Sequence, residues 1–115
     1  PFQHFGATYL ENSYNFTPKS GQGSKSPKNE NKLCFGTDLR FQDIYLEKIN
    51  IDWLLESFKN CPDKEEFFND FFDKLAGTDK LRLQIISGKS SKEIKDSWKE
   101  DLNRFKLVRK KYLLY

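Results

Sequence analysis

The chain has 115 residues, of which 37% are hydrophobic and 32% are charged, and it contains 11 Phe, 5 Tyr and 2 Trp. These large aromatic side chains supply enough apolar area for one modest core, which excludes a wholly disordered chain. The net charge of +3 is too small to indicate a nucleic-acid partner without a concentrated basic patch. No apolar run approaches the roughly 20 residues that span a bilayer, so we expect no membrane insertion. Because the chain begins with Pro1 rather than Met, we expect a fragment or a processed product.

The first third of the chain predicts a small sheet interrupted by a long polar loop. Residues 1–16 are rich in aromatic side chains, and residues 32–41 alternate in the way that is typical of a half-buried strand. Gly36 within this strand indicates a bulge or a close approach by another backbone or a ligand. Residues 17–31 lack large apolar side chains and are dense in Gly, Ser, Pro and Lys, so they predict an exposed loop. A loop of this length is either functional or mobile, and we expect anchored ends and a free middle.

The next segment predicts two helices. Asn50 is the expected N-cap of a helix that Pro62 stops. Asp63 and Glu66 have capping-box spacing at the start of a second helix, and Gly77 closes it. The apolar residues between them recur at helical spacing and predict a core stripe rather than a ligand platform: Phe67, Phe68, Phe71, Phe72 and Leu75.

The last third is mainly helical. Residues 80–87 fit either a strand or a short helix, and the local pattern does not decide between them. Ser90 and Glu93 form a second capping box that opens the clearest helix of the chain. Its apolar stripe consists of Ile94, Trp98, Leu102, Phe105 and Val108. The tail at residues 112–115 is too apolar for a solvated end, so we expect it to dock. The resulting prediction is a single α+β domain, a small sheet covered by three to four helices.

Few residues could carry chemistry, and we predict no catalytic residue, metal site or cofactor. His4 has no partner with metal-binding spacing, so it is interpreted as a packed or surface residue near aromatic side chains. Most carboxylates lie on the polar faces of predicted helices. Asp38 is an exception because it lies on the strand, but beside Arg40 it is more typical of a surface pair. Cys34 and Cys61 could be two free thiols or one disulfide, and both readings stay open.

The order of the motifs resembles the carboxy-terminal part of the YbbC/NamZ family. The matching segments are PFQHFGA, FTPKS, KLCFGTDLR, FFDKLAGTDKLRLQIISGKSSKEI and SWKEDLNRFKLVRKKYLLY. The most specific are LAGTD, the S-G-x-S segment that leads into EI and W, and the terminal R-x-x-YLLY. The resemblance covers essentially the whole chain, and it favours a helix for residues 80–87.

This resemblance implies an activity and an architecture for a parent protein. Members of the family look like exo-β-N-acetylmuramidases, which remove terminal N-acetylmuramic acid from peptidoglycan fragments and so serve cell-wall recycling. A larger amino-terminal domain would supply the catalytic carboxylate. Residues 1–115 would then be an auxiliary domain of a two-domain glycosidase that closes one side of the substrate cleft and is inactive alone. The alternative is a stand-alone carbohydrate- or protein-interaction module. The substrate favours an extracytoplasmic location over a cytoplasmic one.

The basic loop is the best candidate for a binding surface. N-acetylmuramic acid bears a lactyl ether whose carboxylate, when no peptide is attached, attracts a cation or hydrogen-bond donors. The loop offers Lys19, Ser20, Ser24 and Lys25 beside glycines that let the backbone approach closely. We therefore expect these four residues to line the cleft, with Lys19 or Lys25 near the lactyl group. The alternative is a solvated loop far from the cleft.

Overall fold

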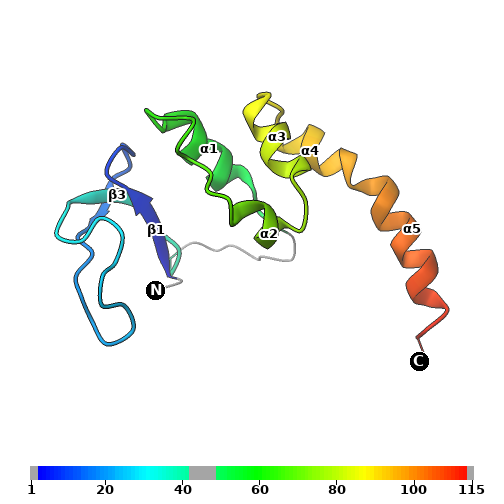
Figure 1. The fold of residues 1–115 in the computed structure, drawn as a ribbon, viewed down its shortest axis with the longest axis horizontal. Coiled ribbons are helices and arrows are strands. Elements are labelled where there is room, and N and C mark those ends of the chain that lie inside the picture. Colours follow the sequence, from blue (N-terminus) through cyan, green and yellow to red (C-terminus); the bar gives the residue numbers. More distant parts are fainter. Residues whose placement is uncertain (1–2, 42–48, 114–115) are drawn as a thin grey trace. The chain divides into compact units, whose positions relative to one another are not determined.

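The computed structural model describes residues 3–41 and 49–113, and in this part of the chain three strands and five helices confirm the expected α+β class (Figure 1). This small domain divides into two compact units, with the boundary between Phe67 and Phe68. The first unit contains the sheet and one helix, and the second contains the other four helices.

The first unit is built on a three-stranded antiparallel sheet in the order β1-β3-β2. Its strands are β1 (His4–Ala7), β2 (Tyr14–Phe16) and β3 (Cys34–Asp38). The strand predicted at residues 32–41 is therefore confirmed at its centre but is shorter than the alternation suggested. Both outer strands come from the first 16 residues, as predicted.

Two glycines allow β1 and β3 to approach closely. Gly6 and Gly36 lie opposite one another in the antiparallel register. A Cβ atom on Gly36 would lie 2.6 Å from the Gly6 Cα and closer still to the Phe5 carbonyl oxygen. On Gly6 it would lie 2.8 Å from the Phe16 ring. The close approach predicted at Gly36 is confirmed, and its partner is the backbone of β1.

Helix α1 (Asp52–Asn60) belongs to the first unit and contacts its sheet. The predicted N-cap at Asn50 is wrong by one residue, because Ile51 occupies that position. The Asn50 side-chain oxygen still accepts a hydrogen bond of 2.9 Å from the Asp52 N–H, at the start of the helix. The Trp53 ring lies 5.5 Å from the Phe5 ring, between ring centroids. Among the described residues of this unit, the buried apolar side chains are Leu10, Cys34 and Ile51.

The predicted helix from Asp63 is wrong over most of its length. The Asp63 carboxylate accepts hydrogen bonds from the Glu65 and Glu66 N–H groups, at 3.1 and 3.2 Å, yet no helix follows. Phe67 instead packs edge-on against Phe58 of α1, with ring centroids 5.3 Å apart. This contact with α1 competes with the local helical pattern and keeps the segment irregular.

Helix α2 begins only at Phe72 (Phe72–Ala76). The Asn69 side chain accepts a hydrogen bond of 3.2 Å from the Phe71 N–H and sets up the turn before it. Gly77 closes the helix in the left-handed conformation, at φ +74°, as predicted. The expected core stripe is wrong for Phe71 and Leu75, which are both exposed.

Helix α3 (Lys80–Ile86) confirms the helical alternative for residues 80–87. Its Arg82 guanidinium forms a bidentate ion pair with Asp73 of α2, with a shortest N···O distance of 2.8 Å. This pair lowers the pKa of Asp73 below its ordinary value, mainly through the side-chain hydrogen bond. The ion pair links α2 to α3.

Helices α4 (Ser91–Ser97) and α5 (Lys99–Lys110) replace the single helix predicted from Ser90. The capping box is confirmed, because the Ser90 hydroxyl accepts from the Glu93 N–H while the Glu93 carboxylate accepts from the Ser90 N–H. The helix is interrupted at Trp98. There the Ser97 hydroxyl donates to the Ile94 carbonyl at 2.6 Å, and the Trp98 N–H bonds to the Lys95 carbonyl, which tightens the last turn of α4.

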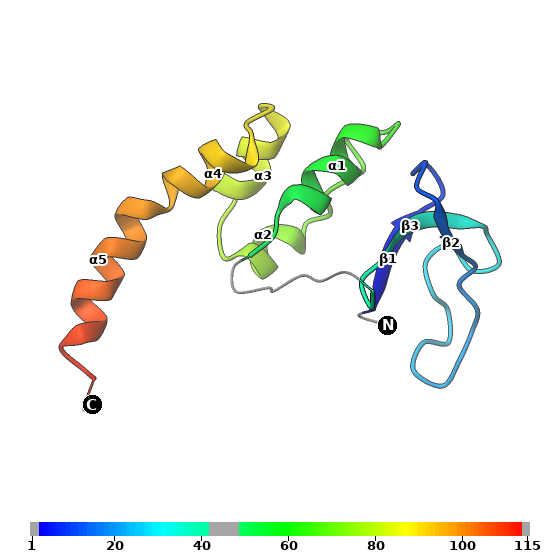
Figure 2. The same ribbon diagram turned by 180° about the vertical axis from the view of Figure 1, so that it is seen from behind.

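The predicted apolar stripe is buried at its beginning and exposed along α5. Ile94 is fully buried, whereas Leu102, Phe105 and Val108 are exposed. Within the second unit, α5 continues beyond α4 and no other helix of that unit lies alongside it (Figures 1 and 2). The predicted tail does not dock within the second unit, because Tyr112 is 78% exposed and Leu113 is 44% exposed. The rest of the tail lies outside the described residues.

Candidate functional site

The loop that joins β2 to β3 holds all four residues predicted to bind substrate. Its tip is a tight turn in which Gly21 and Ser24 exchange backbone hydrogen bonds of 2.9 and 3.1 Å. The Ser20 hydroxyl donates to the Lys25 carbonyl at 2.7 Å and closes the turn at its base. The expectation of a free middle is therefore wrong, because the polar backbone groups there find partners within the loop.

Backbone hydrogen bonds also order the second half of the loop, which leads to β3. The Asn31 N–H donates to the Pro18 carbonyl at 2.9 Å and joins the two sides of the loop. Asn29 and Asn31 adopt positive φ values of 61° and 60°, which asparagine tolerates better than most residues. Lys19 and Lys25 remain exposed on this ordered frame. The loop presents two cations from fixed backbone positions.

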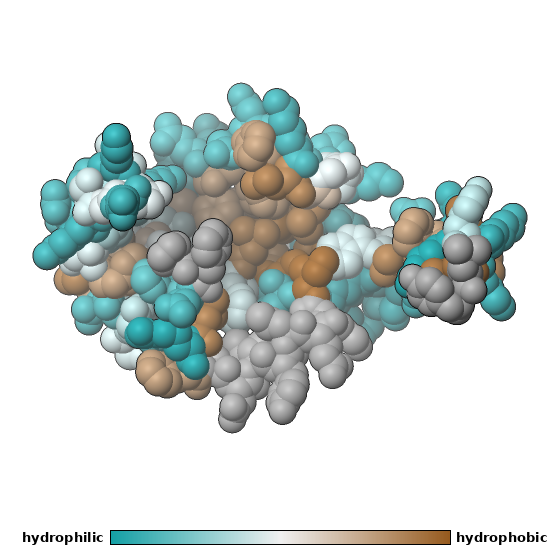
Figure 3. Space-filling model, turned by 90° about the horizontal axis from the view of Figure 1, so that it is seen from below, coloured by the Kyte–Doolittle hydropathy of each residue, from teal (hydrophilic) through white to brown (hydrophobic). Residues whose placement is uncertain are grey.

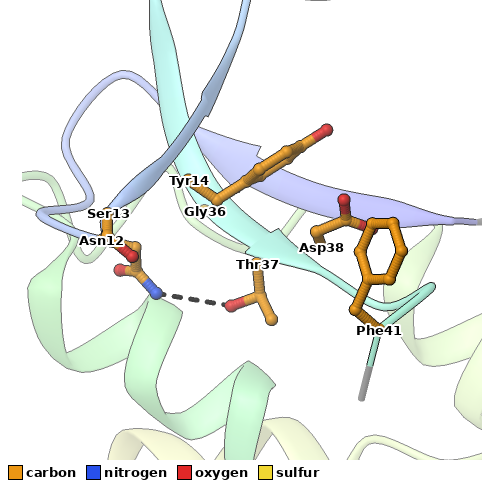
Figure 4. Close-up of a pocket in the computed structure, with 7 residues that line it drawn as sticks. All are labelled: Asn12, Ser13, Tyr14, Gly36, Thr37, Asp38 and Phe41. Carbon is orange, nitrogen blue, oxygen red and sulfur yellow. Dashed lines mark hydrogen bonds between the residues drawn. The ribbon is translucent and has the colours of Figure 1, made fainter.

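A pocket of about 390 Å³ lies at the other end of the β2–β3 pair (Figure 4). Its walls carry an amide, hydroxyl groups, a carboxylate and two aromatic rings, from Asn12, Ser13, Tyr14, Gly36, Thr37, Asp38 and Phe41. The Asn12 amide donates a hydrogen bond of 3.3 Å to the Thr37 hydroxyl and fixes one wall. Phe41 is 83% exposed, and the Arg40 guanidinium lies over one face of its ring, 5.3 Å from the centroid.

Asp38 is held as an anion at the edge of this pocket. The Arg40 guanidinium donates to both carboxylate oxygens, with a shortest N···O distance of 2.7 Å. This hydrogen bonding lowers the pKa of Asp38 to about 2, against the opposing effect of partial burial. The predicted pairing with Arg40 is confirmed. The pair lies at the surface, as predicted, with the Arg40 side chain 48% exposed and the Asp38 side chain 13% exposed.

His4 packs among aromatic rings, as predicted. It lies opposite Asp38 in the β1–β3 register. Its ring centroid is 4.4 Å from that of Phe16 and 5.9 Å from that of Tyr14. His4 therefore supports the strands beside the pocket.

The structure does not bring the predicted loop residues into the pocket. In the antiparallel register Tyr14 lies opposite Gly36 and Phe16 lies opposite Cys34. The pocket sits at the Tyr14 end, while the loop leaves from the Phe16 end. A strand rises about 3.3 Å per residue, so the length of β2 separates them by roughly 10 Å. Only Gly36 and Asp38 among the pocket residues stand out in the sequence, because the pocket combines two segments whose register depends on the tertiary fold.

The cysteines are both free thiols, in agreement with the first of the two alternatives. Cys34 is buried in the sheet, and its thiol donates to the Lys32 carbonyl at 3.6 Å. Cys61 lies beside Tyr9. Burial and the neighbouring Cys61 thiol raise the pKa of Tyr9 to about 12.

The described part of the chain shows neither a metal centre nor a membrane-spanning helix. Among residues 3–41 and 49–113, no group of three or more His, Cys, Asp or Glu side chains is arranged to hold a metal ion. No helix within these ranges is long and apolar enough to cross a membrane. In the described part of the first unit, the polar pocket and the basic loop both suit a ligand.

The sheet, the pocket and the helices that follow define a small α+β domain with a polar pocket. Its sequence identifies its family, since the model described as "Exo-beta-N-acetylmuramidase NamZ, C-terminal" matches residues 1–115. The chain belongs to this family of carboxy-terminal domains.

Two known proteins support this assignment. Peptidoglycan beta-N-acetylmuramidase NamZ from Bacillus subtilis (strain 168) is 33% identical over 92 residues, which cover 76% of this chain and 22% of that protein. The crystal structure of a DUF1343 family protein from Bacteroides fragilis NCTC 9343 is 44% identical, with a TM-score of 0.89. That match covers 100% of this chain and 34% of the solved chain. The present chain thus spans about a fifth to a third of the length of these relatives.

Proposed function

We propose that this chain is the carboxy-terminal domain of an exo-acting β-N-acetylmuramidase, that it forms one wall of the substrate cleft, and that it is not catalytic alone. The observation that carries the proposal is the family match over residues 1–115. The relatives are several times longer than this chain, so a parent protein of similar length has room for an amino-terminal catalytic domain. In that parent the chain would serve the recycling of peptidoglycan fragments.

The chemistry of the pocket supports binding rather than bond cleavage. A typical glycosidase needs two carboxyl groups on either side of the scissile bond, one of them able to donate a proton. Asp38 is the one carboxylate among the residues that line the described pocket. Because Arg40 lowers its pKa to about 2, Asp38 stays ionised at neutral pH and cannot serve as a general acid.

The remaining groups suit a sugar. Asn12, Ser13 and Thr37 offer hydrogen-bonding groups, and the rings of Tyr14 and Phe41 offer apolar faces for the C–H side of a pyranose. Lys19 and Lys25 lie on the loop at the opposite end of β2. We propose that the pocket and the loop contact different parts of one peptidoglycan fragment, with Lys19 or Lys25 near the lactyl carboxylate and Ser20 and Ser24 beside them.

The decisive experiment uses the full-length protein and a chromogenic β-N-acetylmuramide. We expect turnover by the full-length protein and none by residues 1–115 alone. Comparable turnover by the isolated chain would overturn the auxiliary role. Reading the coding sequence upstream of Pro1 tests the rival stand-alone module, because a start codon beside Pro1 would favour that module.

The loop is tested with Lys19→Ala and Lys25→Ala in the full-length protein. We expect at least one of them to lower kcat/KM for the muramide about tenfold, or about 1.4 kcal/mol. Lys28→Ala, in the same loop, is the matched control. If both variants stay within about twofold of wild type, the loop has no such role.

The location of the parent protein follows from its proposed substrate. Peptidoglycan fragments are released outside the cytoplasmic membrane, so we propose an extracytoplasmic protein. Cell fractionation with an antibody against this domain tests the proposal. Recovery of the protein in the cytoplasm alone would contradict it.

A further inference from the structure

Helix α5 carries an apolar stripe that no other helix of the second unit covers (Figures 1 and 2). The α5 stripe consists of Leu102, Phe105 and Val108, which are 49%, 61% and 48% exposed. Successive residues of an α-helix are about 100° apart, so the stripe lies within an arc of about 120°. Tyr112, just beyond the helix, is also exposed. Brown, apolar residues accordingly appear among teal ones on the part of the surface that α5 forms (Figure 3).

Exposed apolar residues are common when scattered, but a row along one side of a helix is typical of a docking face. Burial of this row is not needed to explain why residues 99–110 form a helix, because their helix propensity and charge pattern already favour one. Its first turn holds Glu100 and Asp101 and its last turn holds Arg109 and Lys110, which suit the helix dipole. Arg104 pairs with Glu100 at 3.3 Å. The apolar stripe is therefore typical of a surface that packs against another part of a protein, and no helix of the second unit packs against it.

We infer that the α5 stripe docks against the amino-terminal part of the full-length protein. This inference shares one premise with the proposed function, namely that the chain is the carboxy-terminal part of a longer protein. The family model is described as C-terminal, and the chain spans 22% and 34% of the two relatives, so most of their length precedes the matched region. A large folded region is then available on the same chain, at high effective concentration.

The charges around the stripe describe the partner surface. The end of α5 and its C-cap are basic, because residues 105–111 include Lys106, Arg109, Lys110 and Lys111 and no acidic residue. The complementary surface is apolar at its centre and acidic at its rim, where it meets the carboxyl end of α5. Docking would cover the α5 stripe and leave the opposite side of the helix in water.

That opposite side supplies a matched control. Leu107 is 69% exposed and lies roughly 140° around the helix from Leu102. Leu102→Asp and Leu107→Asp make the same chemical change on the same helix. Only the first places a charge in the proposed interface, so a general effect on helix stability would appear in both variants.

The test is hydrogen exchange of the α5 amides in the full-length protein, with small-angle scattering on the same samples. We expect α5 to be protected at least about tenfold more in the full-length protein than in residues 1–115 alone, because docking suppresses opening of the helix. Leu102→Asp should remove this protection and increase the radius of gyration. Leu107→Asp should change neither quantity.

Two results would overturn the inference. Equal α5 protection in the full-length protein and the isolated chain would show that upstream residues do not cover the stripe. Protection that rises with protein concentration would show that a second copy covers it. Neither readout uses catalysis, so failure of the muramidase assay would leave the outcome of this test unaffected.

Discussion

The two units of this domain are organised over different distances in the sequence. In the second unit, contacts between residues close in the sequence set the start of α4. Ser90 and Glu93 form its capping box, and Lys92 pairs with Asp96 one turn later at 2.8 Å. The first unit depends on residues far apart, such as Gly6 opposite Gly36. A change to a short-range signal should therefore have a contained effect, whereas a change at a strand contact should disturb the whole sheet.

The two tryptophans allow this contrast to be measured. Trp53 lies in the first unit and Trp98 in the second. A Trp98→Phe background leaves Trp53 to report on the first unit, and Trp53→Phe leaves Trp98 to report on the second. Urea unfolding followed by fluorescence then gives a separate transition for each unit.

The largest effect is expected in the core of the second unit. Ile85 is 1% exposed and its neighbour Ile86 is 52% exposed. Ile85→Ala leaves a buried cavity and should lower the free energy of unfolding by about 3 kcal/mol, as read from Trp98. Ile86→Ala should cost less than about 1 kcal/mol, because water fills the space that it leaves. Equal effects of the two changes would contradict the described packing of α3.

The next effect concerns the contact between β1 and β3. Gly36→Ala places a Cβ atom against the Phe5 carbonyl and the Gly6 backbone, and should lower the free energy of unfolding of the first unit by about 2 kcal/mol. Gly23→Ala, in the loop, is the control, because a Cβ atom there meets nothing within 4 Å. The transition reported by Trp53 should shift only for Gly36→Ala. An unchanged midpoint in that variant would mean that the strands do not approach as closely as described.

Loss of the helix cap should have a smaller effect. Ser90→Ala removes the hydroxyl that accepts from the Glu93 N–H and should cost about 1 kcal/mol in the transition reported by Trp98. The pKa of Glu93, which the hydrogen bonds from Ser90 lower, should rise in the variant. Ser91→Ala, one residue further on, keeps the capping box and serves as the control. A Trp53 transition that moved as much as the Trp98 transition would show that the units do not unfold separately.

The smallest effect is the dependence of stability on acid. The folded-state pKa of Asp38, about 2, lies below its ordinary value of 3.8, so its contribution is present above about pH 4 and is lost as the pH falls towards 2. The effect is small because Arg40 is half exposed and water screens the pair. Asp38→Asn should flatten the pH dependence of the Trp53 transition over this window. In the second unit, hydrogen bonds from Lys92 and Lys99 lower the pKa of Asp96 to about 2. Asp96→Asn should therefore flatten the pH dependence of the unfolding transition that Trp98 reports.

Short-range signals were predictable because their partners lie within one helical turn. The capping box at Ser90 and the helix end at Gly77 follow from side-chain chemistry and backbone freedom, and both are confirmed. Asp63 shows the limit of such signals. Its carboxylate makes the expected capping bonds, yet the packing of Phe67 on Phe58 replaces the helix that should follow.

The amino-acid sequence alone determined the α+β class, the capped start of α4, the ends of α1 before Pro62 and of α2 at Gly77 and, through its motifs, the family. Only the tertiary structure decided the register that places Tyr14 beside Gly36 and so forms the pocket. The long loop between β2 and β3 leaves that register open, and a shift of one residue would turn every side chain of a strand to the other face. The exposure of Leu102 and Phe105 was likewise undecided, since an apolar stripe predicts burial but does not name the surface that covers it.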